Sequence, residues 1–467
     1  MDRQSASARS PRLALLAASL GFVIICLDVT VVNVALERIG KTLSVGSTGL
    51  EWVVNAYTLA FASLLLSAGA LGDRLGARRV FVGGLALFTL ASIACGLAPS
   101  ASVLIATRVV QGIAAALCVP SSLSLLNTCF PDPTARAKAV SVWAGTAALA
   151  LGAGPVVGGV LVDRFGWPSI FLINVPFGVV GIWLTLAHAP DSARNAARHI
   201  DLPGQALGVI SLAALTFGVV ESGRLGWESP SVMTGLAGFV VFSALFVMVE
   251  RQQPHPMLPL LLFRIPAVNV TSVVGLLLNF GYYGLMFAMS LFFQTVQSYT
   301  PLEAGLAFLP MTAVVTVANL VSGALAARFG YRLPMVVGQA LAATGFFLSF
   351  TMIGAGSSYL TITVPLLAIG VGVALAVPSI NVALLTHIDP PYVGIASGVL
   401  NTARQIGGAI GVGVFGSLFV GTVSDKVSGL HTAAMIAGGG MVAGALIAIV
   451  VLKRAGASID LRPSTLR

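Results

Sequence analysis

Long apolar stretches, each about the length needed to cross a bilayer, follow one another along almost the whole chain. A helix needs about 20 mainly apolar residues to span a hydrocarbon core about 30 Å thick. Windows of this length predict fourteen transmembrane helices joined by short polar segments. The predicted spans are residues 12–36, 49–71, 79–99, 101–127, 138–162, 168–188, 203–221, 230–249, 267–294, 303–327, 333–354, 359–386, 395–421 and 432–452.

The composition agrees with this pattern. Hydrophobic residues make up 57% of the 467 residues and charged residues only 9%, which is more apolar surface than a soluble core buries. We therefore predict an all-α polytopic membrane protein. We expect the first span to be retained, because it is too long for a signal peptide and has no convincing cleavage site. The 4 cysteines lie in predicted spans or, for Cys129, just beyond one, so we expect no disulfide framework, metal site or cofactor.

The positive charges predict the orientation of the chain in the membrane. If the amino terminus is cytoplasmic, the inner loops and tails hold 18 of the 25 Lys and Arg residues, and the outer loops hold 5. The positive-inside rule then places both termini in the cytoplasm. The net charge of +9 is explained by this topology, and we predict no nucleic-acid partner.

Two internal repeats predict how the spans are grouped. Residues 69–78 recur as 323–332 and residues 116–121 recur as 374–379, with offsets of 254 and 258. Six predicted spans fill about the first 190 residues, so an offset near 256 leaves room for two extra spans between the copies. We expect a 6+2+6 plan with an N-terminal six-helix bundle (1–190), an inserted two-helix linker (191–265) and a C-terminal six-helix bundle with its tail (266–467).

Seven motifs fall in order along these spans. They are Leu27 to Leu36, Trp52 to Tyr57, Gly69 to Arg79, Arg108 to Gly112, Gly145 with Gly154 to Gly159, Phe171 to Pro176, and Arg404 to Gly408. With them the chain resembles the major facilitator superfamily, and specifically its fourteen-span drug:proton antiporter branch, over nearly its whole length. The resemblance implies two helical bundles with the substrate held between them near the bilayer midplane. Glu37 and Ala77 depart from the usual pattern of the family.

Asp28 and Arg108 are charged residues inside predicted spans. An Asp at the centre of a membrane helix costs about 2.5 to 3.5 kcal/mol, so such a residue usually has a partner or a function. Counting about 1.5 Å per residue along the first and fourth spans places both residues at similar depths. We expect the two to meet and Asp28 to carry the coupling proton, with Arg108 tuning it. A static ion pair is the alternative.

Substrate contacts are less clearly indicated. The offset of 254 matches Asp28 with Tyr282, beside Tyr283. A cavity lined by these rings and by Asn55, Gln111 and Asn279 would suit amphipathic, aromatic or cationic compounds. Ordinary helix packing is the alternative for the tyrosines. Glu37, Glu51 and Glu303 lie near outer helix ends, and we expect them to be solvated.

The resemblance assigns two further motifs to conformational change. The segment with Gly69, Asp73, Arg74, Gly76 and Arg78 is expected to be the cytoplasmic loop between spans 2 and 3, and the resemblance implies that it stabilises the outward-facing state. Residues of span 5 form the antiporter motif, which the family uses to bend the helix and limit proton leak; they are Gly145, Gly154, Pro155, Gly158 and Gly159. Arg404 in span 13 lacks a clear acidic partner, so snorkelling and a transport role remain equally open.

These observations predict a proton-coupled antiporter that exports drugs, antibiotics or other amphipathic small molecules from a bacterial inner membrane, with no catalytic residues and as a monomer. A P-loop, HExxH and GxSxG are absent from the sequence, so an ATP-driven pump and a membrane hydrolase are disfavoured. The alternative is a proton symporter or uniporter that imports a metabolite, because the fold alone does not give the direction of transport.

Overall fold

The computed structural model describes residues 10–191, 201–254, 256–388 and 392–454. Within these ranges all the regular elements are helices. The side chains of a few residues inside the helices, Asp73 among them, lie outside the described part. The predicted all-α class is confirmed for the described residues.

The first group of helices is formed by residues up to 188 and is called here the N-terminal group. Two of its helices begin at a side chain that accepts a backbone N–H, Ser100 before α4 and Asp132 before α5. The members of the group are α1 (Pro11–Leu43), α2 (Ser47–Leu75), α3 (Ala77–Gly96), α4 (Ala101–Cys129), α5 (Pro133–Phe165), α6 (Ser169–Leu172) and α7 (Asn174–His188).

Two helices, α8 (Leu202–Leu225) and α9 (Pro230–Gln252), follow the first group, and a short 3-10 helix, η1 (Leu260–Arg264), leads to the second group. Asp201 caps α8 by accepting from the backbone N–H of Gly204 at 2.8 Å. The helix α8 packs against α9, α2 and α15, so it contacts both groups. Most of the α9 surface is exposed in the described chain, as expected for a helix that faces lipid.

The C-terminal group begins at residue 266. Its short helix α11 starts with a capping box, in which Thr300 and Glu303 each bind the other's backbone N–H. The members are α10 (Pro266–Thr295), α11 (Pro301–Ala307), α12 (Leu309–Phe329), α13 (Arg332–Met352), α14 (Tyr359–Thr386), α15 (Val393–Leu418) and α16 (Val423–Arg454).

Twelve helical stretches among the described residues are long and apolar enough to cross a membrane. Two further long helices, α2 with 29 residues and α15 with 26, are not in this set. The fourteen-span count is therefore not confirmed, and the structure supports twelve candidate spans.

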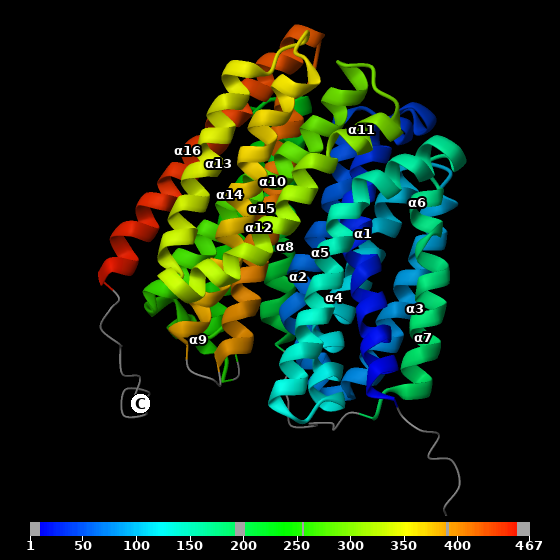
Figure 1. Cartoon of the computed structure of the whole chain (residues 1–467), viewed down its shortest axis with the longest axis vertical. Coiled ribbons are helices and arrows are strands. Elements are labelled where there is room, and N and C mark those ends of the chain that lie inside the picture. Colours follow the sequence, from blue (N-terminus) through cyan, green and yellow to red (C-terminus); the bar gives the residue numbers. More distant parts are fainter. Residues whose placement is uncertain (1–9, 192–200, 255, 389–391, 455–467) are drawn as a thin grey trace, which may run out of the picture.

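The two groups stand side by side, with α1 beginning and α16 ending toward the lower side of the view in Figure 1. We call this side the terminal end and the opposite side, where α6 and α11 lie, the distal end. Side-chain hydrogen bonds between the groups are found at the distal end. Ser290 donates to the carbonyl of Asn33 at 2.6 Å, and Gln294 donates to the carbonyl of Val34 at 3.1 Å.

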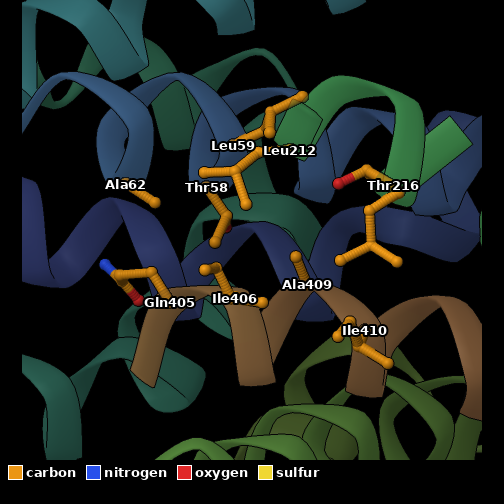
Figure 2. Close-up of a pocket in the computed structure, with 10 residues that line it drawn as sticks. Thr58, Leu59, Ala62, Leu212, Thr216, Gln405, Ile406, Ala409 and Ile410 are labelled. Atoms are coloured by element: carbon orange, nitrogen blue, oxygen red, sulfur yellow. The ribbon is translucent and has the colours of Figure 1, made fainter. Parts of the chain in front are cut away.

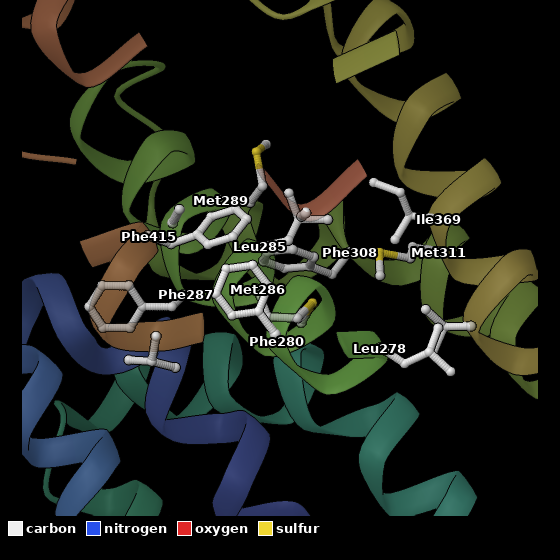
Figure 3. Close-up of a cluster of buried hydrophobic side chains, with 14 of the residues drawn as sticks. Leu278, Phe280, Leu285, Met286, Phe287, Met289, Phe308, Met311, Ile369 and Phe415 are labelled. Carbon is white, nitrogen blue, oxygen red and sulfur yellow. The ribbon is translucent and has the colours of Figure 1, made fainter. Parts of the chain in front are cut away.

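The largest hydrophobic cluster extends across this contact. It joins the distal half of α1 to α10 and to the C-terminal group. Figure 3 shows members of this cluster, among them Met286 and Phe287 of α10, Phe308, Met311 of α12 and Phe415 of α15. Fully burying such side chains is worth about 1.5 to 3 kcal/mol each in water, but in lipid the close packing itself holds the helices together.

Candidate functional site

Asp28 and Arg108 form an ion pair inside the N-terminal group. Asp28 lies on α1 and Arg108 on α4, and each residue is only 1% exposed. An Nη1 hydrogen of Arg108 points at Oδ2 of Asp28. The helix α1 starts at the terminal end and α4 at the distal end. Asp28, 17 positions after the start of α1, and Arg108, 7 positions after the start of α4, therefore lie at the same depth.

Neutral side chains complete a hydrogen-bond network around this pair. Gln111, one turn beyond Arg108, donates to Oδ1 of Asp28 at 3.0 Å and accepts from Arg108 at 2.7 Å. Asn174, the first residue of α7, donates to Oδ1 of Asp28 at 3.4 Å. Ser92 of α3 accepts from both Gln111 and Asn174. The carboxylate thus accepts from three side chains on two helices.

The guanidinium of Arg108 has further partners that fix its position. Its Nε donates to the backbone carbonyl of Val53 at 3.1 Å. Its Cζ lies 4.3 Å from the ring centre of Tyr57 and 5.8 Å from that of Phe171. A cation over an aromatic face in a dry environment is worth up to about 2 kcal/mol. Arg108 is therefore held by contacts from α1, α2 and α6, and not by the carboxylate alone.

Sequence reasoning missed Ser92, Asn174 and Tyr57 as members of this network. Each is a polar residue in an apolar helix, and Asn174 stands at the break between α6 and α7, within the motif from Phe171 to Pro176. That motif contributes to the family resemblance, but the resemblance does not predict which groups the Asn174 side chain contacts. Polar residues inside a span are themselves a signal of a buried network.

The residues predicted to line one substrate cavity lie in three places. Gln111 belongs to the ion-pair network, and Asn55 is buried on α2 with neither side-chain atom hydrogen-bonded. Tyr282 and Tyr283 stand edge to face on α10, with ring centres 5.5 Å apart. Asn279 accepts from Arg404. Among the described residues no hydrogen bond joins these three places, and the contact of the five residues with substrate stays a prediction.

Arg404 lies on α15 where this helix packs closely on α10. A methyl group placed on Gly275 would lie 2.9 Å from Cγ of Arg404, so the glycine makes room for the long side chain. The Nε of Arg404 donates to Asn279 at 3.5 Å. In the described part of the chain no carboxylate forms an ion pair with it. The amide of Asn279 is its hydrogen-bond partner instead.

A small cavity lies between α2, α8 and α15, and Figure 2 shows its lining. Its volume is about 10 Å³, which is room for about one water molecule. Thr58, Thr216 and Gln405 provide its polar atoms. Gln405 follows Arg404 directly, so the motif of span 13 faces both this cavity and α10.

The segment from Gly69 to Arg78 differs from the predicted loop. The helix α2 continues to Leu75 and α3 begins at Ala77, so Gly76 is the only residue between them. The φ of Gly76 is 94°, a conformation that side chains other than glycine rarely adopt. Glycines inside the segment pack against α4, with Gly72 near Ser121. In membrane helices glycine serves packing more often than turning.

Around this turn, Arg78 forms an ion pair with Asp191 at 2.7 Å and donates to the carbonyl of Leu186 at 2.5 Å. Arg74 is exposed. The side chain of Asp73 lies outside the described residues, so its predicted conformational role stays a prediction. The predictions for Gly69, Gly76 and Arg78 as conformational residues are likewise untested.

The glycines of the motif in α5 lie at the junction of the two groups. A methyl group on Gly154 would lie 2.7 Å from Cβ of Thr30, and one on Gly158 would lie 3.1 Å from Cα of Val31 in α1. One on Gly159 would lie 2.8 Å from the carbonyl oxygen of Pro301, where α11 begins. The α5 surface thus fits against α1 on one side and α11 on the other.

Two other members of this motif behave differently from each other. The backbone of Pro155 faces Gly305 of α11, where an added methyl group would lie 3.0 Å from the Pro155 carbonyl carbon. Gly145 has open space around it, with no atom within 4 Å of an added methyl group. Close helix packing therefore explains Gly154, Gly158 and Gly159, and does not explain Gly145.

One acidic residue contradicts the expected solvation. Glu51 is 0% exposed, and neither of its carboxyl oxygens has a hydrogen-bond partner. Its place near the start of α2 predicts a solvated helix end, but α15 and α8 cover it. Glu37 is mostly covered and pairs with Lys41, and Glu303 closes the capping box of α11.

Known proteins share both sequence and fold with this chain. A family model described as Major Facilitator Superfamily matches residues 18–412. The methylenomycin A resistance protein of Streptomyces coelicolor is 40% identical over 400 residues, covering 86% of this chain and 84% of that protein. The tetracenomycin C resistance and export protein of Streptomyces glaucescens is 32% identical over 416 residues, covering 89% and 77%.

Two solved structures have a similar fold at low sequence identity. A bacterial homologue of the human drug peptide transporters superposes with a TM-score of 0.66 at 15% identity, covering 95% of this chain and 99% of its own. The xylose transporter XylE from E. coli gives a TM-score of 0.64 at 13% identity, covering 97% and 99%. At these identities the likeness concerns the fold alone.

Proposed function

Because this chain belongs to the Major Facilitator Superfamily and is a multi-pass membrane transporter, we propose that it exports drugs, antibiotics or other amphipathic small molecules in exchange for protons. Relatives with 32% to 40% identity are named as resistance or export proteins, which supports the direction of transport. We propose a bacterial inner membrane as its location and the terminal end as the cytoplasmic side. Substrate and protons are its proposed partners, and it works as a monomer.

The observation that carries the proton coupling is the buried Asp28. A carboxylate at this depth is costly unless it is paired and hydrogen-bonded. Here Arg108, Gln111 and Asn174 supply the donors. A proton arriving at Asp28 would remove the negative charge that Arg108 binds, and so would change the packing of α1 against α4. Because α1 also contacts α5 and α10, the protonation state of Asp28 is linked to the contact between the groups.

We also propose that α2 and α15 cross the membrane together with the twelve candidate spans, which gives fourteen spans in a 6+2+6 plan. Both helices have the length of their neighbours and pack between them. Gly72 of α2 lies against α4, and Arg404 and Gly407 of α15 lie against α10, away from lipid. Residues 1–190 and 266–467 are then the two bundles, and 191–265 is the inserted linker.

The proton gradient provides enough free energy for this exchange. One proton crossing about 150 mV releases about 3.5 kcal/mol. For a neutral compound exchanged one for one, this supports a concentration ratio of several hundred, since about 1.4 kcal/mol corresponds to a factor of ten. A monovalent cation exchanged for one proton would depend on the pH difference alone.

The test is proton flux in proteoliposomes with an acidic interior and an internal pH dye. Lipophilic cations and neutral antibiotics are added outside, and substrate-driven alkalinisation of the interior is the expected result. Asp28→Asn should abolish it, whereas Glu228→Gln, which changes an exposed carboxyl, should not. A flux in Asp28→Asn equal to that of the wild type would assign Asp28 a structural role. Co-movement of substrate and protons in the same direction would support import.

A further inference from the structure

Glu51 is a buried carboxyl that the proposed exchange at Asp28 does not use. It lies one turn into α2 at the distal end and is 0% exposed. Both of its oxygens lack a hydrogen-bond partner. The residue is on the same face of α2 as Asn55, Thr58 and Ala62, and this face packs against α8 and α15. Glu51 is therefore sealed between the N-terminal group, α8 and the C-terminal group.

The contact with α15 is close and leaves no room for water. A methyl group on Gly416 would lie 2.5 Å from Oε1 of Glu51 and 2.6 Å from its Cγ. Ser417 packs on Gly223 of α8 in the same layer. The surface of α15 that covers the carboxyl is thus made of backbone and small side chains, and it brings no donor to either oxygen.

The charged groups around Glu51 do not compensate a negative charge. Glu221 of α8 is the charged neighbour, and it binds Trp52 and Arg224 with its own oxygens. In α15, Gly416 and Ser417 are not titratable. Of the cations of α1 and α4 toward the distal end, Lys41 pairs with Glu37, Arg108 pairs with Asp28, and Arg38 is exposed to the surroundings of the helix. An ionised carboxylate without partners is among the most costly groups to bury.

We propose that Glu51 is a second proton-binding carboxyl, and that the distal side of the transporter closes only when this carboxyl carries a proton. The proposal rests on the alternating access of the proposed function. When α15 moves away from α2, Glu51 meets outside water and ionises. When the helices return, the carboxyl must first take a proton from outside. Because it is sealed while the terminal end is open, that proton goes back outside and is not counted among the transported protons.

This arrangement makes the distal contact sensitive to external pH. At an external pH low enough to protonate Glu51, the closed form is favoured. At a higher external pH Glu51 is ionised and the open form is favoured, because water hydrates the charge only in the open form. The dependence is separate from coupling at Asp28. Removal of the carboxyl should therefore leave the ratio of protons to substrate unchanged, and should alter only how external pH controls closure.

The test measures the distance between spin labels across the distal end of the full-length protein in nanodiscs. Thr42→Cys on α1 and Ser424→Cys on α16 are exposed and lie in opposite groups, and Cys129→Ser removes the cysteine that is only partly buried. Distances are recorded between about pH 5 and pH 9, a range that covers the titration of exposed and buried carboxyls.

In the otherwise unmodified protein the distribution should shift from short to long distances as the pH rises. Glu51→Gln should lose this shift and remain at the short distance, while Glu51→Asp and the exposed control Glu228→Gln should keep it. Asp28→Asn should also keep the shift, even though it abolishes proton flux, so this proposal and the proposed exchange fail independently.

Three results would overturn the proposal. The first is a distance that does not depend on pH in the protein with Glu51. The second is a normal shift in Glu51→Gln. The third is loss of the pH-dependent distance shift in Asp28→Asn while Glu51→Gln keeps the shift, which would assign the shift to Asp28. In proteoliposomes, a lower proton-to-substrate ratio in Glu51→Gln would show that Glu51 carries transported protons and would contradict its role as a closure site.

Discussion

The hydroxyl of Ser290 on α10 donates a 2.6 Å hydrogen bond to the backbone carbonyl of Asn33 on α1, and both residues are buried. This bond joins the two helical groups at the distal end, five residues beyond Asp28 in the same helix. One turn further along α10, Gln294 repeats the contact with the carbonyl of Val34. The coupling helix α1 is thus bonded to the opposite group through its backbone.

We expect Ser290→Ala to weaken closure of the distal end. A buried hydrogen bond contributes about 0.5 to 1.5 kcal/mol, which would change the ratio of closed to open forms by about two- to thirteenfold. The labelled pair Thr42→Cys and Ser424→Cys measures this ratio. Ser349→Ala is the matched control, because Ser349 is equally buried and bonds only within its own helix, to Gly345. Equal effects of the two variants would contradict the role of the Asn33 contact.

We expect Gly159→Ala to reduce transport strongly, by about tenfold or more, because the added methyl group meets the backbone of Pro301 and Leu302 and holds α5 away from α11. Substrate-driven proton flux measures the loss. Gly145→Ala lies in the same helix with open space around it and should transport normally. If both variants transport equally well, close packing of α5 against α11 is not required for the cycle.

We expect Asp28→Asn to leave the protein folded while substrate-driven proton flux disappears. The amide keeps the shape of the side chain and an acceptor for Arg108, but it takes up no proton. Asp28→Leu removes the acceptor as well as the countercharge of Arg108, and should lower the free energy of unfolding by about 3 to 5 kcal/mol. Thermal unfolding in detergent compares the two variants. Similar unfolding of both would indicate that Arg108 is held by Val53 and Tyr57 without the carboxylate.

We expect Asn174→Ala to slow transport several-fold without abolishing it. The variant removes a donor to Asp28 and to Ser92, and leaves the ion pair itself in place. An unsatisfied buried group costs about 1 to 3 kcal/mol, so a moderate loss of stability should accompany the slower turnover. Initial rates at saturating substrate measure turnover, and the concentration for half-maximal rate reports binding. A change confined to substrate binding would place Asn174 in the substrate site instead.

The depth of charged residues is predictable from sequence, because helix geometry converts residue counts into distance. Counting along spans 1 and 4 indicates that Asp28 and Arg108 lie at one level, and the structure places them in contact. The neutral members of the network cannot be found this way. Ser92 and Asn174 come from helices whose rotation relative to α1 is set by packing, and the sequence alone does not state that rotation.

Two wrong predictions have a common physical origin. Glu51 is expected in solvent and Gly69 to Arg79 in a loop, because in water-soluble proteins charged residues and glycines mark helix ends. In the membrane the same residues mark where backbones approach each other. Gly416 admits the Glu51 side chain against α15, and Gly72 admits α4 against α2. Whether such a residue marks a helix end or a close helix contact depends on which helix packs against it. That neighbour is set by the tertiary structure and cannot be read from the sequence.

The position of α8 restricts how the protein can move. Its distal end is tied to α2 through Glu221 and Trp52, its terminal end is tied to α2 through Gln205 and Ser63, and its other side packs on α15. The N-terminal and C-terminal groups are both attached to α8. They can therefore separate least beside α8 and most on the opposite side of the molecule. We therefore expect the widest opening, and any entry of substrate from the lipid, on the side of α5 and α12.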